Sequence, residues 1–184
     1  MLLIILIWKI IFMAVIQFNG REYNTLGELP MVGQDMPDCY AVDENLRDVN
    51  LNELGDNTLV LNIFPSIDTP TCSASVKKFN EMAASLNHVS VLCISADLPF
   101  AQKRFCKSFS LDNVQVLSTF RGDLGDVLGV AIAEGPMQAL MSRAVLVVDS
   151  FGVVRHCQQV KDLLHTPVDY QQVWQVLSKQ YQIT

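Results

Sequence analysis

The chain of 184 residues is half apolar, so it can bury one cooperative core without a disulfide framework or a structural metal. Its 13 basic and 19 acidic side chains give a net charge of −6. This balance argues against nucleic acid or an anionic membrane surface as a partner, because both need a basic face. The apolar content also excludes a disordered chain. We therefore expect one folded domain, in which each of the five cysteines has to be interpreted separately.

Residues 1–16 form an apolar stretch that only Lys9 interrupts. The stretch is shorter than the roughly 20 residues that span a bilayer, and it lacks the basic start and the cleavage site of a secretory signal. Three interpretations stay open: translation that begins at Met13, a genuine anchor or signal, and an extension packed on the domain. We treat residues 1–12 as an extension outside a domain at residues 13–184. We expect a cytoplasmic protein, with a periplasmic or membrane-associated location left open by this stretch.

The first part of the domain predicts a hairpin and then alternating strands and helices. Asn19-Gly20 favours a two-residue hairpin turn, because both of its residues accept a positive φ. The elements expected from apolar periodicity, in chain order, are hairpin strands at 15–18 and 21–25, a short strand at 39–42, a buried strand at 58–64, a helix at 72–86, a buried strand at 89–95 and a helix at 99–107.

The second part of the domain adds strands to the same sheet. Its expected elements are a strand at 114–117, a short helix at 123–128, an apolar strand at 144–148, a hairpin partner at 153–160 and an amphipathic helix at 169–180. The hairpin partner can only be antiparallel, and the near-continuous apolarity of the strand at 58–64 favours a central parallel strand covered on both faces. This order predicts an α/β fold with a central mixed β-sheet flanked by helices and an N-terminal β-hairpin.

A segment suited to chemistry joins the buried strand at 58–64 to the following helix. The sequence PSIDTPTC at residues 65–72 brings Cys72 into the first turn of that helix. Free backbone N–H groups there favour an anion, and sites in open α/β sheets usually lie at the carboxyl ends of strands. A free cysteine thiol needs roughly 3 kcal/mol of differential stabilisation to be mainly thiolate at neutral pH, of which a helix terminus supplies about 1. We therefore expect a nearby cation.

Two interpretations of Cys72 remain open from these residues, an ordinary buried cysteine and a reactive thiolate. A metal site is disfavoured, because no second cysteine or histidine lies within two to five residues of Cys72. A C-x-x-C motif is absent, because Thr69 and Ser75 occupy the flanking positions. The remaining candidates are expected to be structural cysteines, Cys39, Cys93 and Cys157, and surface histidines, His88, His156 and His165.

Four blocks of the sequence resemble the peroxiredoxins. Pro65, Thr69 and Cys72 match the P-x-x-x-T/S-x-x-C motif of that family. The blocks NIFPSIDTPTC, VLCISADLPFAQKRFC, LSTFR and SRAVLVVD are similar, in this order, to the bacterial thiol peroxidase branch, the atypical two-cysteine peroxiredoxins. The resemblance extends from about residue 13 to the C-terminus, and it implies a thioredoxin-like fold.

The resemblance also implies roles for the residues around the motif. Cys72 matches the peroxidatic cysteine, which attacks the peroxide. Thr69 matches the threonine whose hydroxyl orients the peroxide and contacts the thiolate, and Pro65 matches the proline that shields the site from water. Arg143 stands where the family has its active-site arginine, so it would supply the expected cation.

Cys106 matches the resolving cysteine of this branch, and the resemblance therefore implies an intrachain Cys72–Cys106 disulfide. Two other resolving arrangements are disfavoured. Lys77 stands five residues after Cys72, where one of them needs a cysteine, and no cysteine follows Cys157 in the C-terminal tail.

The function implied by the resemblance is that of a thiol-dependent peroxidase. It would reduce hydrogen peroxide and organic hydroperoxides, and thioredoxin would restore the dithiol. No metal ion, haem or flavin is implied, because the sulfur itself is oxidised, and the family leads us to expect a homodimer. The alternative is a redox-sensing protein of the same fold that relays oxidation to a partner. A thiol–disulfide oxidoreductase is disfavoured by the missing C-x-x-C.

Overall fold

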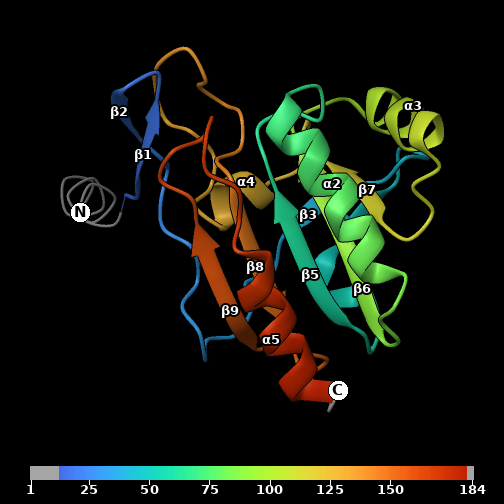
Figure 1. The fold of residues 1–184 in the computed structure, drawn as a ribbon. Coiled ribbons are helices and arrows are strands. Elements are labelled where there is room, and N and C mark those ends of the chain that lie inside the picture. Colours follow the sequence, from blue (N-terminus) through green and yellow to red (C-terminus); the bar gives the residue numbers. More distant parts are fainter. Residues whose placement is uncertain (1–12, 182–184) are drawn as a thin grey trace.

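The computed structural model describes residues 13–181 and arranges them around one mixed β-sheet (Figure 1). The extension expected at residues 1–12 lies outside the described residues. Helices lie on both faces of the sheet, and a separate two-stranded hairpin precedes it in the chain, which confirms the expected α/β architecture. Within residues 13–181 we find no helix with the length and apolar character needed to cross a membrane.

Seven strands form the sheet in the spatial order β4-β3-β7-β6-β5-β8-β9. In chain order they are β3 (Tyr40–Val42), β4 (Asp48–Asn50), β5 (Thr58–Ile63), β6 (Val89–Ser95), β7 (Gln115–Ser118), β8 (Ala144–Val148) and β9 (Val154–Gln159). β5 lies between a parallel neighbour, β6, and an antiparallel neighbour, β8. β9 pairs antiparallel with β8, as its short connection predicts. All residues of β5 are buried, which confirms it as a central strand covered on both faces.

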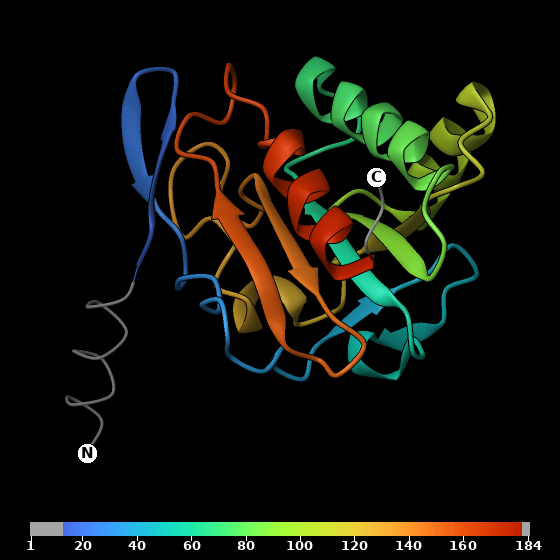
Figure 2. The ribbon, with the colours of Figure 1, turned by 60° about the horizontal axis from the view of Figure 1, so that its bottom comes forward.

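Three helices cover one face of the sheet and a short one lies on the other (Figures 1 and 2). They are α2 (Pro70–Ala83), α3 (Pro99–Phe109) and α5 (Tyr170–Tyr181) on the first face and α4 (Leu124–Val127) on the second. α2 begins at Pro70, before the expected start at Cys72, because proline suits the first helical turn and Thr69 is extended. Cys72 therefore lies in the first turn, as predicted.

The N-terminal hairpin forms at Asn19-Gly20 as predicted. β1 (Val15–Phe18) pairs antiparallel with β2 (Arg21–Asn24), and the two turn residues have φ values of 52° and 73°. Ile16 is fully buried and packs in a small cluster with Leu163. The hairpin therefore supports the segment that follows β9.

The structure contains two elements that were not predicted, and it corrects one expectation. β4 and the short 3₁₀-helix at Leu51–Glu53 were not predicted, because Asp48-Val49-Asn50 is brief and mostly polar. His156 was expected at the surface, but it lies in β9 with only 9% of its surface exposed. It pairs with Val147 on the face that α5 covers, so strand alternation turns the imidazole toward the core.

Asp149 stabilises the turn between β8 and β9. Its Oδ1 accepts hydrogen bonds from the backbone N–H groups of Phe151 at 2.9 Å and Val153 at 3.0 Å, and its Oδ2 accepts one from Arg155 Nε at 2.6 Å. Burial alone raises the pKa of Asp149, but these hydrogen bonds outweigh burial and lower it below the usual value.

We predict that Asp149→Asn lowers the free energy of unfolding at neutral pH by about 2 kcal/mol, because charge-assisted hydrogen bonds are lost. The pKa of Asp149 is lower in the folded protein than in the unfolded chain, where it is about 3.9. The stability that this difference gives is present above the unfolded pKa and is lost as the pH falls through the folded pKa. Urea unfolding across acid and neutral pH should therefore show the difference shrinking in acid. Asp48→Asn, which weakens only the exposed ion pair with Arg121, is the control and should cost much less. A difference that is independent of pH would contradict this prediction.

Candidate active site

Cys72 lies at the start of α2, directly beyond the carboxyl end of β5. The loop at residues 64–69 connects the two elements, and Ser73 N donates to Thr69 O at 2.9 Å as the helix begins. The Cys72 residue has no exposed surface. Backbone N–H groups of a first helical turn have no partners within the helix, so this helix end adds partial positive charge to the surroundings of the sulfur.

Arg143 brings a cation to the sulfur from the neighbouring strand. It precedes Ala144, which pairs with Ile63 at the end of β5, so the antiparallel register sets Arg143 beside the start of α2. Its Nη2 donates to Cys72 Sγ at 3.4 Å and to Leu163 O at 2.9 Å. Arginine keeps its positive charge in proteins, so this contact favours a thiolate on Cys72.

The guanidinium also has spare donors. Arg143 is 2% exposed, yet its Nε and Nη1 find no hydrogen-bond partner among residues 13–181. A buried N–H group without a partner is costly. The site therefore presents donors that an oxygen atom of a small bound molecule could satisfy.

The two other motif residues lie in the connecting loop. Pro65 is buried directly after β5. The Thr69 hydroxyl donates to Ser66 O at 3.1 Å, and among residues 13–181 no hydrogen bond joins it to the Cys72 sulfur. Its lone pairs remain able to accept a hydrogen bond from a bound molecule. The structure thus brings Cys72, Arg143, Thr69 and Pro65 into one region.

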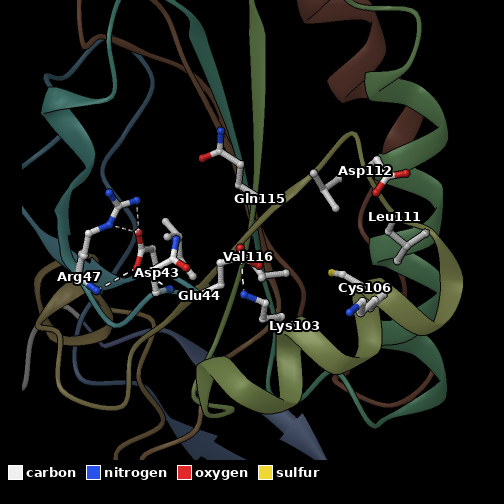
Figure 3. Close-up of a pocket in the computed structure, with 13 residues that line it drawn as sticks. Asp43, Glu44, Arg47, Lys103, Cys106, Leu111, Asp112, Gln115 and Val116 are labelled. Atoms are coloured by element: carbon white, nitrogen blue, oxygen red, sulfur yellow. Dashed lines mark hydrogen bonds and ion pairs between the residues drawn. The ribbon is translucent and has the colours of Figure 1, made fainter.

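Cys106 lies on the second helix, α3, and all five cysteines are free in this structure. It is half-buried and packs against the same apolar cluster that contains Cys72. It also lines a cavity of about 560 Å³ between α3, β7 and the turn after β3, together with Glu44 and Asp112 (Figure 3). Burial, together with the negative charges of Glu44 and Asp112, raises the pKa of the Cys106 thiol to about 11. Cys106 is therefore a protonated thiol at neutral pH.

Among residues 13–181, none of the other cysteines forms a hydrogen bond with Arg143. Burial raises the pKa of both Cys39 and Cys93 to about 12, although a hydrogen bond from Asn62 Nδ2 to Cys93 Sγ at 3.6 Å partly opposes this for Cys93. Cys157 is half-buried in β9. Buried thiols without a nearby cation stay protonated and unreactive.

Tyr170 belongs to this site, although the sequence did not indicate it. It begins α5 and stacks edge-on against Phe79 of α2, with ring centroids 5.3 Å apart. Burial raises the pKa of Tyr170, and a hydrogen bond with Ser75 lowers it. The charge of Arg143 also lowers this pKa, whereas Cys72 raises it. The sequence carried no signal for this residue, because the packing of α5 beside α2 joins segments about 100 residues apart.

The arrangement suits a thiolate that attacks a small electrophile. A sulfur held beside a buried cation in surroundings of low dielectric is a stronger charge partner than it would be in water. Because Cys72 has no exposed surface, such a molecule has to displace neighbouring atoms to reach the sulfur. Among residues 13–181 no group of three histidine, cysteine, aspartate or glutamate side chains is arranged to hold a metal ion.

We predict that Arg143→Ala slows alkylation of Cys72 about tenfold at neutral pH and moves its pH dependence upward, because the thiolate loses its cation. The rate is measured with iodoacetamide over a pH series, with Cys72 followed by peptide mass. Arg143→Lys keeps the charge and is the matched control, which should retain most of the reactivity. An Arg143→Ala protein that is folded by circular dichroism and has an unchanged pH profile would contradict this role.

Comparisons with known proteins show the family to which the chain belongs. The Redoxin family model matches residues 31–173. The thiol peroxidase of Corynebacterium glutamicum is 45% identical over 158 residues, which cover 86% of this chain and 95% of that protein. The thiol peroxidase of Mycobacterium tuberculosis is 42% identical over 155 residues, which cover 84% of this chain and 93% of that protein.

Solved structures show the same fold. A peroxiredoxin-like protein from Aquifex aeolicus superposes with a TM-score of 0.84 at 36% identity, covering 91% of this chain and 98% of that chain. A thiol peroxidase from Chromobacterium violaceum gives a TM-score of 0.81 at 21% identity, over 91% of this chain and 97% of that chain. The expected thioredoxin-like fold with its N-terminal hairpin is confirmed. The chain belongs to the Redoxin family and, within it, to the thiol peroxidases of the peroxiredoxin group, so it is a thiol-dependent peroxidase.

Proposed function

We propose that Cys72 is the peroxidatic cysteine of this enzyme and that it attacks hydrogen peroxide or an organic hydroperoxide. The observation that carries this proposal is the contact of 3.4 Å between Arg143 Nη2 and Cys72 Sγ at the start of α2. None of the other thiols has a comparable cation partner among residues 13–181. Cys72 is thus the cysteine whose thiolate the surroundings favour most.

The first step breaks the O–O bond of the hydroperoxide. The Cys72 thiolate attacks one oxygen, an S–O bond forms, and the second oxygen leaves as an alkoxide or hydroxide that takes up a proton. Sulfur is oxidised to a sulfenic acid, and the peroxide is reduced to alcohol or water. The spare Nε and Nη1 donors of Arg143 suit the charge that develops on the leaving oxygen. Thr69 orients the peroxide and hands on a proton, and Pro65 keeps bulk water out.

The second step joins Cys72 to Cys106. The Cys106 thiol gives up its proton and attacks the sulfenic sulfur, so that an S–S bond forms, the S–O bond breaks and water leaves. A disulfide needs Cα atoms within about 7 Å, whereas the two cysteines belong to separate folded helices. We therefore expect the start of α2, part of α3, or both to unwind in each cycle.

Three further proposals concern the reductant, the oligomeric state and the compartment of the enzyme. A thioredoxin-type reductant fits an enzyme whose oxidised form is an intrachain disulfide, and we propose thioredoxin itself. We also propose a homodimer, and a cytoplasmic location, since repeated turnover needs a compartment that keeps thiols reduced. Turnover with thioredoxin, thioredoxin reductase and NADPH tests the reductant, and analytical ultracentrifugation tests the homodimer. A monomer, or stoichiometric oxidation without turnover, would overturn them.

We predict that Cys72→Ser abolishes peroxide reduction, because the nucleophile is lost. Cys106→Ser should complete one rapid round and then stop with thioredoxin, because the sulfenic acid has no resolving thiol. Cys157→Ser, which replaces a half-buried thiol in β9, is the control and should turn over normally. Turnover is followed as NADPH consumption, and the disulfide formed by one equivalent of peroxide is mapped by mass. A bridge that lacks Cys72 or Cys106 would refute the mechanism.

The acidic surroundings of Cys106 give a prediction for the second step. Glu44 raises the pKa of Cys106, so Glu44→Gln should lower that pKa and increase the thiolate fraction at neutral pH. Disulfide formation should become roughly two- to fivefold faster. In the wild type the same step should accelerate as the pH rises toward the Cys106 pKa of about 11. Quenched-flow counting of free thiols measures the rate.

The control for this prediction is Glu53→Gln, which removes an equal charge from the 3₁₀-helix after β4. This control should leave the rate of disulfide formation unchanged. Equal rates in the Glu44 and Glu53 variants would show that Glu44 does not restrain Cys106.

A further inference from the structure

The loop after β6 links the two cysteine segments through one carboxylate. Asp97 Oδ1 accepts a hydrogen bond from Ser66 Oγ at 2.8 Å, and Asp97 Oδ2 accepts one from Ile67 N at 2.7 Å. Both donors belong to the loop that leads from β5 to Cys72. Asp97 Oδ2 also accepts a hydrogen bond from Ser95 Oγ at 2.7 Å. One half-buried aspartate therefore receives three hydrogen bonds, two of them from the Cys72 loop.

The same set of hydrogen bonds continues into the helix that carries Cys106. Gln102 Nε2 donates to Ser95 Oγ and to Leu117 O, both at 2.9 Å. Gln102 is 1% exposed and precedes Cys106 by one helical turn on α3. An unbroken path of side chains thus runs from the Cys72 loop through Asp97 and Ser95 to α3.

The chemistry of this path requires a carboxylate at its centre. Three donors converge on Asp97, and an ionised carboxylate is a pure acceptor with enough lone pairs for all of them. An asparagine would offer one acceptor oxygen and turn an NH₂ group toward the remaining donors. Hydrogen bonds to a charged group are also stronger than neutral ones. The network therefore holds the two segments firmly in the arrangement of the reduced enzyme.

We propose that Asp97 is a positioning residue that couples the Cys72 loop to the Cys106 helix and sets the rate of disulfide formation. This inference rests on the proposed roles of Cys72 and Cys106. The two helices must move relative to each other before their cysteines can bond, so the hydrogen bonds at one end of the path have to break first. Their strength is then part of the barrier to the second step.

The coupling also decides the fate of the sulfenic acid on Cys72. Attack by Cys106 forms the disulfide and releases water. Attack on a second hydroperoxide instead transfers one more oxygen to sulfur, gives a sulfinic acid and reduces that peroxide to alcohol or water. A firm Asp97 network slows the first route and leaves more time for the second. Loosening the network should therefore protect the enzyme from overoxidation.

The test is a double-mutant cycle on the rate of disulfide formation after a single peroxide pulse. Ser66→Ala removes a donor at the Cys72 end, and Gln102→Met removes the link at the Cys106 end with similar volume. Each should raise the rate constant about three- to tenfold. Because release at either end frees the same network, the rate increase in the double variant should be clearly smaller than the product of the two single increases.

The control pair combines Ser66→Ala with Ser108→Ala, whose hydroxyl bonds only to Arg104 O within α3. This pair should be multiplicative. A second measurement is the peroxide concentration that converts half of Cys72 to sulfinic acid. In the Ser66 and Gln102 variants this concentration should rise by the same factor as the rate constant for disulfide formation. A purely structural loss of stability would not produce matching factors. Asp97→Asn, if it folds, should show the largest increase in both quantities.

Two outcomes would overturn the inference. Rate constants for disulfide formation that are unchanged or lower in the single variants would show that the network does not restrain the step. Strictly multiplicative effects of Ser66→Ala and Gln102→Met would show that Asp97 does not couple the two ends. Sulfenic acid on Cys72 is trapped in parallel in Cys106→Ser, in which no resolving thiol consumes it. Its absence there would overturn the proposed function as well and identify that as the failure.

Discussion

The buried contact between the Arg143 guanidinium and the Cys72 sulfur is the interaction on which the site depends. A cation that is 2% exposed must be compensated, because burying an unpaired charge is very costly. Besides Cys72, the only partner it has among residues 13–181 is the neutral carbonyl of Leu163. In the proposed mechanism a thiolate on Cys72 supplies the missing negative charge, so that the guanidinium and the sulfur stabilise each other. The sheet makes this possible, because antiparallel pairing sets the start of β8 beside the end of β5.

The presence of a neighbouring cation also distinguishes Cys72 from the other thiols. Burial is the main cause that raises the pKa of Cys39, Cys93 and Cys106, and none of the causes that act on these thiols within residues 13–181 is a cation. For Cys106 this suits a group that should not react with peroxide itself but should act after Cys72 has been oxidised. We propose that the Asp97 network adds to this difference, because its hydrogen bonds hold the Cys72 loop and the Cys106 helix in the arrangement seen here. The named relatives are peroxidases, and nothing in the comparisons favours the redox-sensing alternative.

Much of the fold could be predicted from local pattern, whereas contacts between distant segments could not. The apolar runs of β5, β6 and β8 and the Asn19-Gly20 turn are signals contained within a few residues, and each is confirmed. β4 is too short and polar to give such a signal. The burial of His156 depends on which face of β9 receives α5, and the position of Tyr170 depends on the same packing. The motif around Cys72 could be recognised from the sequence. The contacts of the Leu163 carbonyl and the Asp97 carboxylate could not, because they depend on the packing of distant segments.

Direct titration of the Cys72 sulfur tests the central claim most sharply. Replacing Cys39, Cys93, Cys106 and Cys157 by alanine leaves one thiol, whose thiolate absorbs in the ultraviolet where the protonated form does not. The account predicts that the thiolate absorbance is already close to its plateau at neutral pH in a folded protein. An absorbance that appears only around pH 8.5, as for free cysteine in water, would contradict the proposal that Arg143 and the start of α2 hold the sulfur as an anion.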